Sequence, residues 1–304
     1  MELVLGAAQF GLPYGVTNYT GKQPSYNNFV SILDYAYDHN ITTLDTAETY
    51  GDANLRISTF HHASSKRFKI INKILREPVY EPRQLVELKS KLRNELNKMD
   101  IPCFDVIMLH YAPSITDLVR QDFFFDLIKA GITKKIGVSV NNRNEYALIQ
   151  NKFLWDVVQI PSNILNQNII DQDFFKILKE NNCEIHVRSI YLQGLLLADT
   201  NLIPKHLIRL APFVLKIQNL AKKLDVSVQT LCMIFVMSNK FIDKIVFGVQ
   251  SKNELASILE SYQNAKNFSE KNIHIDWTEF GCSDPALVDP TQWSKLEALN
   301  DSNR

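Results

Sequence analysis

Hydrophobic and polar positions along the chain alternate between two patterns. Short apolar runs rich in β-branched residues, typical of buried strands, are separated by longer stretches with apolar positions at helical spacing. The strand pattern recurs at residues 3–6, 41–45, 68–73, 104–110, 135–140, 156–160, 184–190 and 242–249. The helical pattern recurs at residues 25–39, 52–62, 81–99, 123–129, 143–152, 171–180, 206–224, 227–238 and 251–265.

This alternation predicts the fold class. Strands that alternate with helices form parallel sheets, and about eight such units favour closure into a (β/α)8 TIM barrel. An open doubly wound sheet is the alternative, but it would want a GxGxxG turn after the first strand, where this chain has GAAQFG. We expect one domain over residues 1–304, with the barrel over about 1–268 and a carboxyl-terminal extension over about 269–304.

Composition excludes several classes of protein. Lys+Arg and Asp+Glu both number 33, so the zero net charge disfavours nucleic-acid and anionic-membrane partners. No apolar run reaches the roughly 18 to 20 residues of a membrane span, and the first residues lack the basic region of a signal peptide. The four cysteines are far apart with no Cys/His cluster, so we expect reduced thiols, no metal site and a cytoplasmic location.

Candidate chemistry lies where three predicted strands end. Asp45 ends one strand and Tyr50 follows in the turn that we expect over 46–51, while Lys73 and His110 end the next two strands. Residues at the carboxyl ends of parallel strands face the ligand in α/β proteins. Each of the four side chains alone has an ordinary structural explanation, such as a turn acid or a solvated lysine. Together they predict a site.

The residues around these four positions resemble the aldo-keto reductase superfamily. The resemblance is carried by Asp45 and Tyr50 in LDTAETYG, Lys73 in IINK and His110 in VIMLH. It also includes the opening LVLGAAQFGLPYG, the IGVS ending at Ser139 and the VVQIPSNILNQ segment. The resemblance implies a barrel that reduces an aldehyde or ketone with NAD(P)H. It also implies that a carboxyl-terminal loop helps to form the wall of the substrate pocket. Simple capping of the barrel is an equally good explanation of the carboxyl-terminal extension.

Reduction of a carbonyl needs a hydride at carbon, which the nicotinamide supplies, and a proton at oxygen, which the protein supplies. A free tyrosine has a pKa of about 10, and a nearby ammonium lowers such a value. By resemblance, Tyr50 is therefore the general acid, Lys73 the neighbouring ammonium and Asp45 its partner. His110 is the hydrogen-bond donor that orients the carbonyl oxygen.

The resemblance also assigns a cofactor site, with departures from the family pattern. Ser139 matches the serine that holds the nicotinamide carboxamide, but Val140 stands where an asparagine is expected and Asn141 follows it. Gln159 matches the carboxamide-binding glutamine, and Arg188 stands where many relatives place a tyrosine under the nicotinamide ring. The further expected cofactor residues on this side are Ser189, Gln193 and Gly194.

The last strand and helix should hold the adenosine end of the cofactor, through Gly248, Gln250, Lys252 and Glu254. Where many relatives carry arginine or glutamine for the 2′-phosphate, this chain has Glu254. Ser257 and Ile258 likewise replace a familiar Glu-Asn pair. NADP(H) is the family default, and this departure makes NAD(H) a second option.

The leading interpretation is a cytoplasmic NAD(P)H-dependent reductase of a small, polar carbonyl compound. The opening segment and QIPSNILNQ resemble bacterial members associated with surface-polysaccharide pathways, which suggests a sugar or nucleotide-linked sugar as substrate. One alternative is an aldolase-type barrel in which Lys73 forms a Schiff base. Another is a nucleotide-binding barrel with a regulatory or partner-binding role and no turnover. The sequence gives no prediction of oligomeric state.

Overall fold

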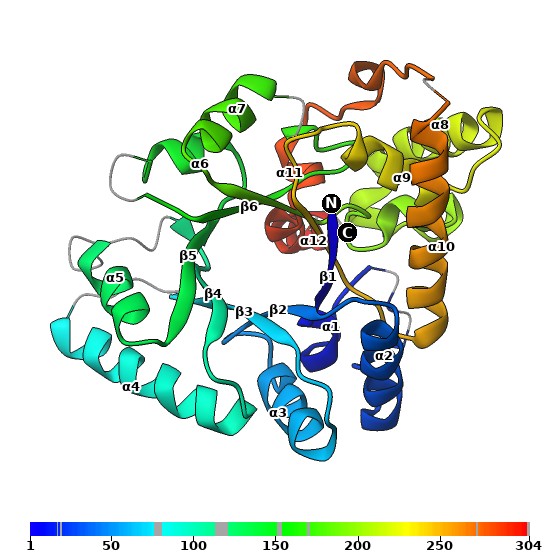
Figure 1. The fold of residues 1–304 in the computed structure, drawn as a ribbon. Helices are drawn as coiled ribbons and strands as arrows, with labels where there is room; N and C mark the ends of the chain where they lie inside the picture. The colour runs from blue at the N-terminus through cyan, green and yellow to red at the C-terminus, as the bar shows by residue number, and fades with distance from the viewer. Residues whose placement is uncertain are drawn as a thin grey trace.

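The strand patterns close into a ring of eight parallel strands, each paired with its neighbour in the chain (Figure 1). The computed structural model describes residues 1–16, 18, 20–75, 81–112, 121–150, 154–168, 171–271 and 273–302. The strands are β1 (Glu2–Gly6), β2 (Thr43–Ala47), β3 (Lys69–Ile74), β4 (Phe104–Leu109), β5 (Thr133–Ser139), β6 (Val157–Pro161), β7 (Glu184–Arg188) and β8 (Lys244–Phe247). Pairing of β1 with β8 completes the barrel. The predicted (β/α)8 fold is confirmed, and the open sheet is excluded.

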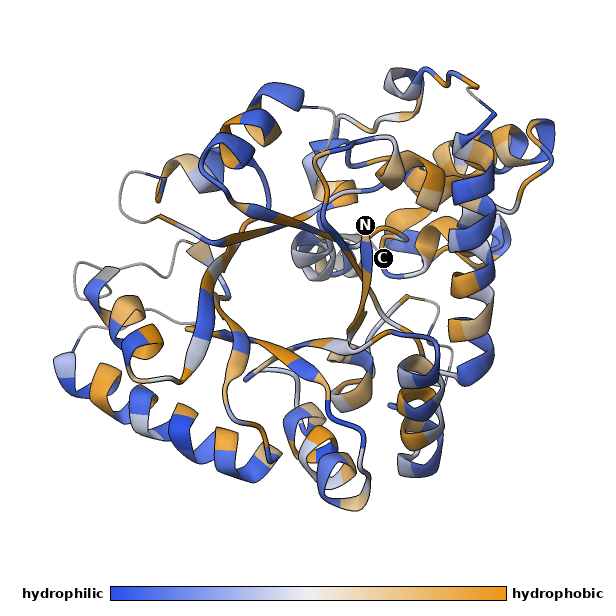
Figure 2. Cartoon of the chain, viewed as in Figure 1, coloured by the Kyte–Doolittle hydropathy of each residue, from blue (hydrophilic) through white to orange (hydrophobic). Residues whose placement is uncertain are grey.

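Helices surround the ring, and α4 illustrates their amphipathic pattern with alternating hydrophobic and hydrophilic stripes (Figure 2). The α-helices are α1 (Ala8–Gly11), α2 (Tyr26–Asp38), α3 (Ala53–Ala63), α4 (Pro82–Met99), α5 (Gln121–Lys129), α6 (Arg143–Ala147), α7 (Gln172–Glu180), α8 (Ala211–Lys223), α9 (Val228–Met237), α10 (Lys252–Ser269), α11 (Pro285–Val288) and α12 (Trp293–Ser302). Short 3-10 helices are η3 (Leu195–Leu197), η4 (Thr200–Leu202), η5 (Lys205–Leu210), η6 (Trp277–Phe280) and η7 (Pro290–Gln292). Among the described helices, none is both long and apolar enough to cross a membrane.

Serine side chains fix the starts of several helices. Ser25 accepts a hydrogen bond from the backbone of Asn28, Ser227 from Thr230, and Ser251 from Glu254. Each serine satisfies a backbone N–H that has no partner within its own helix. The cap at Ser251 fixes where α10 begins, and this start lies beside the proposed adenosine end of the site.

A small apolar cluster fills the inside of the barrel. It consists of side chains from five strands, namely Val4, Ile71, Val106, Met108, Val157 and Val246. All six are almost completely buried. The barrel interior is therefore a packed core. Polar residues that project inward nearer the carboxyl ends of the strands can form a site above this apolar floor.

Several strand boundaries differ from those predicted, and two of them lie at the site. The turn expected over 46–51 begins later, because β2 continues through Ala47 and pairs with β3 as far as Lys73. The strand expected to reach Ile190 ends at Arg188, because Ser189 has a left-handed backbone with φ of 61°. Pairing with the neighbouring strand decides where β2 ends, and the backbone geometry of Ser189 decides where β7 ends. Neither is visible in a hydropathy pattern.

Three predicted connections were also wrong in detail. The helix predicted over 143–152 ends at Ala147, and its last two residues lie outside the described residues. The segment 206–224 is divided into η5 and α8, because Pro212 lacks the backbone N–H that a continuous helix would require. The segment after β1, in which Gly6, Gly11 and Gly15 predict a loop, contains the short helix α1.

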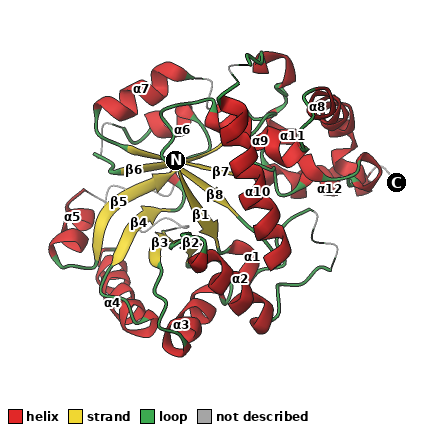
Figure 3. Cartoon of the chain, turned by 45° about the vertical axis from the view of Figure 1, so that its right-hand side comes forward, coloured by secondary structure: helices red, strands yellow, loops and turns green. Residues whose placement is uncertain are grey.

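The carboxyl-terminal extension packs beside the barrel, with α11 and α12 on the same side of the ring as α8 (Figure 3). Its Trp277 ring meets the Phe235 ring of α9 edge to face, with centroids 5.1 Å apart. The Trp293 indole donates a 2.9 Å hydrogen bond to the carbonyl of Leu287. These contacts hold the residues around Asp289 at the mouth of the barrel, where they line its cavity.

A charged cluster at the opposite, amino-terminal end of β7 gives a stability prediction. Glu184 accepts hydrogen bonds from Lys135 at 2.6 Å and from His186 at 2.9 Å, and it pairs with Lys244 at 2.9 Å. Burial raises the pKa of the Glu184 carboxyl, but these partners outweigh burial and hold the pKa well below its usual value. This stabilisation is therefore complete above the unfolded-state pKa and is lost as the pH falls below it.

We expect Glu184→Gln to lower the free energy of unfolding at pH 7 by about 2 kcal/mol, and by less at pH 4. Urea denaturation at both pH values measures the difference. Glu180→Gln is the control, because Glu180 makes only an exposed helical pair with Lys176 and should change stability by less than about 0.5 kcal/mol. A loss for Glu184→Gln that is the same at both pH values would contradict this account.

Candidate active site

A cavity of about 700 Å³ lies at the carboxyl ends of the strands. It brings together the four residues predicted to act in catalysis. Asp45 comes from β2, Tyr50 from the turn that follows β2, Lys73 from β3 and His110 from the position just after β4. The structure therefore gathers side chains that are separated by as many as 65 positions in the sequence.

Asp45 and Lys73 form an ion pair that is almost fully buried, with side-chain exposures of 3% and 2%. The Lys73 ammonium donates a hydrogen bond to Oδ1 of Asp45. Burial alone would lower the pKa of Lys73, but electrostatic interactions with Asp45 and Tyr50 outweigh it, so the net effect raises the pKa. Lys73 is therefore a positively charged ammonium in the folded protein.

Tyr50 lies against this pair and against His110. Nζ of Lys73 is 3.5 Å from the Tyr50 hydroxyl oxygen and 5.5 Å from the centroid of the ring. The His110 ring meets the Tyr50 ring edge to face, with centroids 5.9 Å apart. The tyrosine hydroxyl thus lies beside an ammonium, and the tyrosine ring packs against an imidazole.

Two glycines allow the backbone to place Tyr50. Gly51 has φ of 54°, which favours glycine, and a Cβ at Gly51 would lie 2.1 Å from the carbonyl oxygen of Gly11. A Cβ at Gly11 would lie 1.8 Å from the carbonyl oxygen of Tyr50. Close packing of the β1 loop on the β2 turn therefore requires glycine at both positions.

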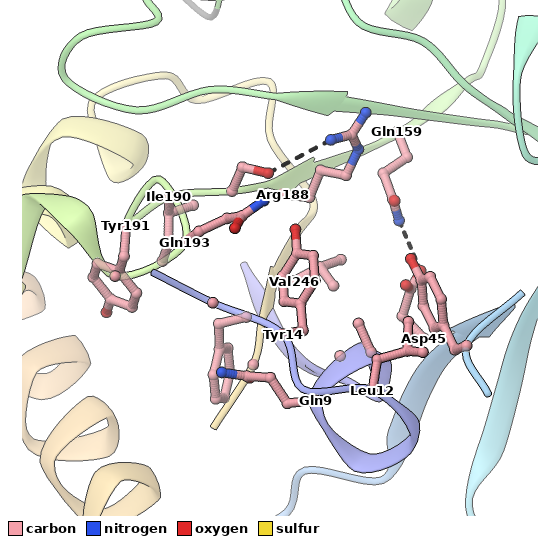
Figure 4. A pocket seen from close by; sticks show the side chains of 18 of the residues that line it. Gln9, Leu12, Tyr14, Asp45, Gln159, Arg188, Ile190, Tyr191, Gln193 and Val246 are labelled. Carbon is pink, nitrogen blue, oxygen red and sulfur yellow. Dashed lines mark hydrogen bonds between the residues drawn. The ribbon is translucent and has the colours of Figure 1, made fainter. Parts of the chain in front are cut away.

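Gln159 connects the ion pair to the predicted carboxamide site. Its Nε2 donates a 2.8 Å hydrogen bond to Oδ2 of Asp45, as Figure 4 shows. Its Oε1 is completely buried and has no hydrogen-bond partner among the described residues. Ser139 lies beside Gln159 in the strand register. A buried amide oxygen without a partner is costly unless a ligand donates to it, and the NH₂ of a nicotinamide carboxamide is a donor of the right kind.

The predicted residues at the end of β7 line the same cavity. Nη2 of Arg188 donates a 2.9 Å hydrogen bond to Oδ1 of Asn141, whose Nδ2 donates a 2.9 Å bond to Glu145. Asn141, which follows the unmatched Val140, is thus occupied by protein partners. The neighbouring loop holds Ser189, Gln193 and Gly194 in left-handed backbone conformations, and the carbonyl of Gln193 accepts a bond from the β1 loop at Val16.

At the proposed adenosine end, Gly248, Gln250 and Glu254 line the cavity, but Lys252 does not. Nζ of Lys252 instead lies 5.0 Å from the centroid of the Tyr35 ring. Oε2 of Glu254 accepts a 2.8 Å hydrogen bond from the backbone N–H of Gln250. Of the two expected residues at the amino-terminal end of α10, the carboxylate of Glu254 therefore lines the cavity and Lys252 does not.

Several lining residues were not predicted. They come from the β1 loop, from α9 and from the carboxyl-terminal extension, and include Gln9, Tyr14, Gln229, Asp289 and Thr291. The β1-loop residues lie within the opening motif LVLGAAQFGLPYG, which could have indicated them. Gln229 accepts hydrogen bonds from Ser257 and Ser261 of α10, a contact between two helices that no local pattern indicates.

Comparison with known proteins agrees with this fold. The aldo/keto reductase family model matches residues 2–275. The solved aldo-keto reductase of Bacillus halodurans in its holo form is 13% identical, with a TM-score of 0.68 over 97% of this chain and 91% of that one. The glycerol dehydrogenase of Gluconobacter oxydans is 15% identical, with a TM-score of 0.64 over 90% of this chain and 93% of that one. Among curated protein sequences, none matches the chain.

The fold and the family match together define a barrel of the carbonyl-oxidoreductase class. The chain belongs to the aldo/keto reductase family, because the family model covers most of its length. The resemblance carried by the residues around Asp45, Tyr50, Lys73 and His110 is thereby confirmed at the level of the family. The structural neighbours are too distant in sequence to indicate more than a shared fold.

Proposed function

We propose that this chain reduces an aldehyde or ketone to an alcohol with NAD(P)H, and that Tyr50 donates the proton to the carbonyl oxygen. The observation that carries the proposal is the buried Asp45–Lys73 ion pair with the Tyr50 hydroxyl 3.5 Å from Nζ of Lys73. When bound, the reduced nicotinamide supplies the hydride to the carbonyl carbon.

Each residue of the cluster has a distinct role in moving that proton. Asp45 keeps Lys73 charged and in place, and the ammonium stabilises the negative charge that Tyr50 acquires as it releases its proton. His110, whose ring meets the Tyr50 ring edge to face, would donate a hydrogen bond to the carbonyl oxygen of the substrate. The buried surroundings strengthen both interactions, because little water screens them.

The same geometry disfavours the Schiff-base alternative. A lysine must lose its proton before its nitrogen can attack a carbonyl. Lys73 is buried against Asp45, and the attraction of this carboxylate helps to raise the pKa of Lys73. An aldolase-type lysine would instead need a lowered pKa. This cluster therefore favours reduction with Tyr50 as the acid over a Schiff-base mechanism. A barrel without turnover would not need the four residues of the cluster.

Gln159 and Ser139 would hold the carboxamide of the cofactor, and Gln193 and Gly194 lie on the loop that would cover its pyrophosphate. Family resemblance favours NADP(H), whereas the residues at the adenosine end support NAD(H). Glu254 offers an acceptor that suits a ribose hydroxyl and repels a 2′-phosphate. Lys252 is turned toward Tyr35, so among the described residues that line this end no lysine or arginine offsets the carboxylate.

We therefore expect NADH to bind at least as tightly as NADPH, and Glu254→Gln to tighten NADPH binding by about five- to tenfold, about 1 kcal/mol or slightly more. Removal of one carboxylate near the phosphate removes a repulsion that NADH does not meet. Titration followed by nicotinamide fluorescence measures both constants. Glu260→Gln, on the same helix but away from the cavity, is the matched control. Much tighter binding of NADPH in the wild type, unchanged in Glu254→Gln, would contradict this account.

The substrate is proposed to be a small polar carbonyl compound, with a sugar or nucleotide-linked sugar as the specific candidate and a cytoplasmic setting. The walls of the cavity support a polar substrate, since they carry hydroxyl, amide and guanidinium groups beside the proposed acid. A panel of simple aldehydes, keto sugars and sugar nucleotides tests this point with NADH and NADPH as alternative reductants. Turnover of simple aldehydes with no turnover of the sugar compounds would contradict the sugar assignment.

A further inference from the structure

A second cavity, of about 550 Å³, opens beside the first. The two cavities share a wall that includes Tyr14, Arg188 and Asp289. The rest of the second cavity lies between the loops after β5 and β6 and the carboxyl-terminal extension. Four asparagines contribute to this lining, namely Asn142, Asn144, Asn166 and Asn168. A ligand at the catalytic cluster in the first cavity could therefore extend alongside these shared residues into the second cavity, which is lined by amides.

Arg188 is the cation of this shared wall, and no carboxylate among the described residues forms an ion pair with it. None of the ion pairs found in the described part of the chain involves Arg188, whereas Lys73, the other strong cation that lines the first cavity there, is paired with Asp45. The guanidinium makes a 2.9 Å hydrogen bond to Asn141 and a longer one of 3.5 Å to Ser189. Both acceptors are neutral, so a full positive charge faces the cavities.

Two acidic side chains that line the same cavities, Glu145 and Asp289, bond to other partners. Glu145 directs both carboxylate oxygens to Asn141, one to its backbone N–H at 2.7 Å and one to its side-chain amide at 2.9 Å. Asn141 thus stands between Glu145 and Arg188 and orients the guanidinium without neutralising it. Asp289 uses Oδ1 to accept bonds from the backbone and hydroxyl of Thr291, at 3.0 and 2.8 Å.

We propose that Arg188 binds an anionic oxygen group, a carboxylate or a phosphate, on the substrate of the proposed reductase. The body of the substrate beyond that group would lie in the asparagine-lined cavity. A guanidinium offers paired N–H donors that match the two oxygens of such a group. The asparagine amides provide donors and acceptors for hydroxyl groups on the same molecule. The substrate is accordingly an acidic, oxygen-rich carbonyl compound, which narrows the proposed function and rests on it.

This role is compatible with stacking of Arg188 on the nicotinamide. A guanidinium stacks through its planar face, whereas its N–H donors lie in the plane and point outward. Five such donors exist, and the described protein partners take two of them. The remaining donors are available to an anion whether or not the face is covered.

Matched pairs of aldehydes test the proposal and distinguish its two sources of charge. Succinic semialdehyde and butanal differ in a carboxylate, and glyceraldehyde 3-phosphate and glyceraldehyde differ in a phosphate. In the wild type we expect kcat/KM for the charged member of at least one pair to exceed that of its neutral partner on the order of tenfold or more, mainly through KM. In Arg188→Gln that ratio should fall to about one. Arg188→Lys should give an intermediate ratio, because lysine keeps the positive charge but lacks the paired N–H donors of the guanidinium.

Arg143→Gln is the matched control, since this nearby guanidinium is exposed, pairs with Asp171 and lines neither cavity. Its ratios should equal those of the wild type. No preference for either charged aldehyde, or a preference that survives in Arg188→Gln, would overturn the proposal. An equal loss on all four aldehydes in Arg188→Gln would also overturn it, because Arg188 would then act on the cofactor alone.

A binding measurement separates this inference from the reductase proposal. Calorimetric titration with 4-hydroxybutyrate and with 1-butanol needs no turnover. If the anion subsite exists, 4-hydroxybutyrate binds the wild type and Arg143→Gln but binds Arg188→Gln at least tenfold more weakly, even if no aldehyde is reduced. Equal binding of 4-hydroxybutyrate to all three proteins would refute a carboxylate subsite, and glycerol 3-phosphate in the same titration tests a phosphate subsite.

Discussion

Tyr50→Phe is expected to lower kcat/KM for carbonyl reduction by about 10³-fold, within the range that a positioned acid contributes. The substitution removes the hydroxyl that lies 3.5 Å from Nζ of Lys73 and keeps the ring that meets His110. Binding of NADH and NADPH should stay within about twofold of the wild type, because the hydroxyl group is not among the expected cofactor contacts. Steady-state rates with a reactive aldehyde and fluorescence titrations measure the two quantities.

Tyr14→Phe is the matched comparison, because it removes a tyrosine hydroxyl from the wall of the same cavity, on the loop after β1. Its loss of kcat/KM should be far smaller than that of Tyr50→Phe. Similar losses in the two variants would mean that a hydroxyl group is needed for packing or hydration of the cavity and not as an acid. Full activity of Tyr50→Phe would assign the proton to another group.

Lys73→Met is expected to lower the free energy of unfolding by about 3–5 kcal/mol, because it leaves Asp45 charged and buried without its partner. It should also abolish measurable reduction, since the ammonium beside Tyr50 is gone. The double variant Asp45→Asn/Lys73→Met should recover most of the lost stability, because an uncharged pair carries no unpaired buried charge. It should not recover activity. Urea denaturation and steady-state rates separate the two effects.

Lys66→Met serves as the control, because this lysine pairs with the more exposed Asp34 and Asp38 at the surface. Its cost should be within about 1 kcal/mol, as for exposed ion pairs. If the double variant were as unstable as Lys73→Met, packing of the lysine side chain and not its charge would account for the loss. If it were active, the proposed role of the ammonium would be wrong.

The sequence was sufficient to predict the parts of this molecule that follow from local periodicity and chain order. Alternating strand and helix patterns led to the barrel, because parallel strands in sequence order can close only when enough of them are present. Asp45, Lys73 and His110 each lie at the end or just after the end of an apolar run. Since parallel strands end at the same rim, their meeting in one cavity could be foreseen from spacing and order alone.

The sequence was insufficient where side-chain direction depends on tertiary contacts. Lys252 and Glu254 are two residues apart at one helix start, yet the lysine lies over Tyr35 of α2 and the glutamate lines the cavity. Gln9 lines the site beside Gly248, where a Cβ would lie 2.0 Å from Oε1 of Gln9 and would force its amide to move. Contacts between elements distant in the chain decide which side chains line the cavity, and local propensity and periodicity do not predict such contacts.

The uncompensated charge of Arg188 belongs to the same category. Its partner Asn141 and the more distant Glu145 lie more than forty positions earlier, on the connection after β5. From the sequence, Arg188 was interpreted only as a replacement for a stacking tyrosine. The second cavity, formed with the carboxyl-terminal extension, adds a space beside Arg188 that could hold an anionic ligand, and no sequence pattern indicates it.

A single-turnover experiment tests the central claim most directly, namely that this cavity reduces a carbonyl with a bound nicotinamide. Wild-type protein is loaded with NADH or NADPH and mixed rapidly with succinic semialdehyde or a reactive neutral aldehyde, while absorbance of the reduced nicotinamide is followed. We predict a fast loss of one equivalent of that absorbance in the wild type and none on the same time scale in Tyr50→Phe loaded to the same extent. Binding of neither cofactor at micromolar concentrations, or loss of absorbance at the same rate in both proteins, would contradict the account.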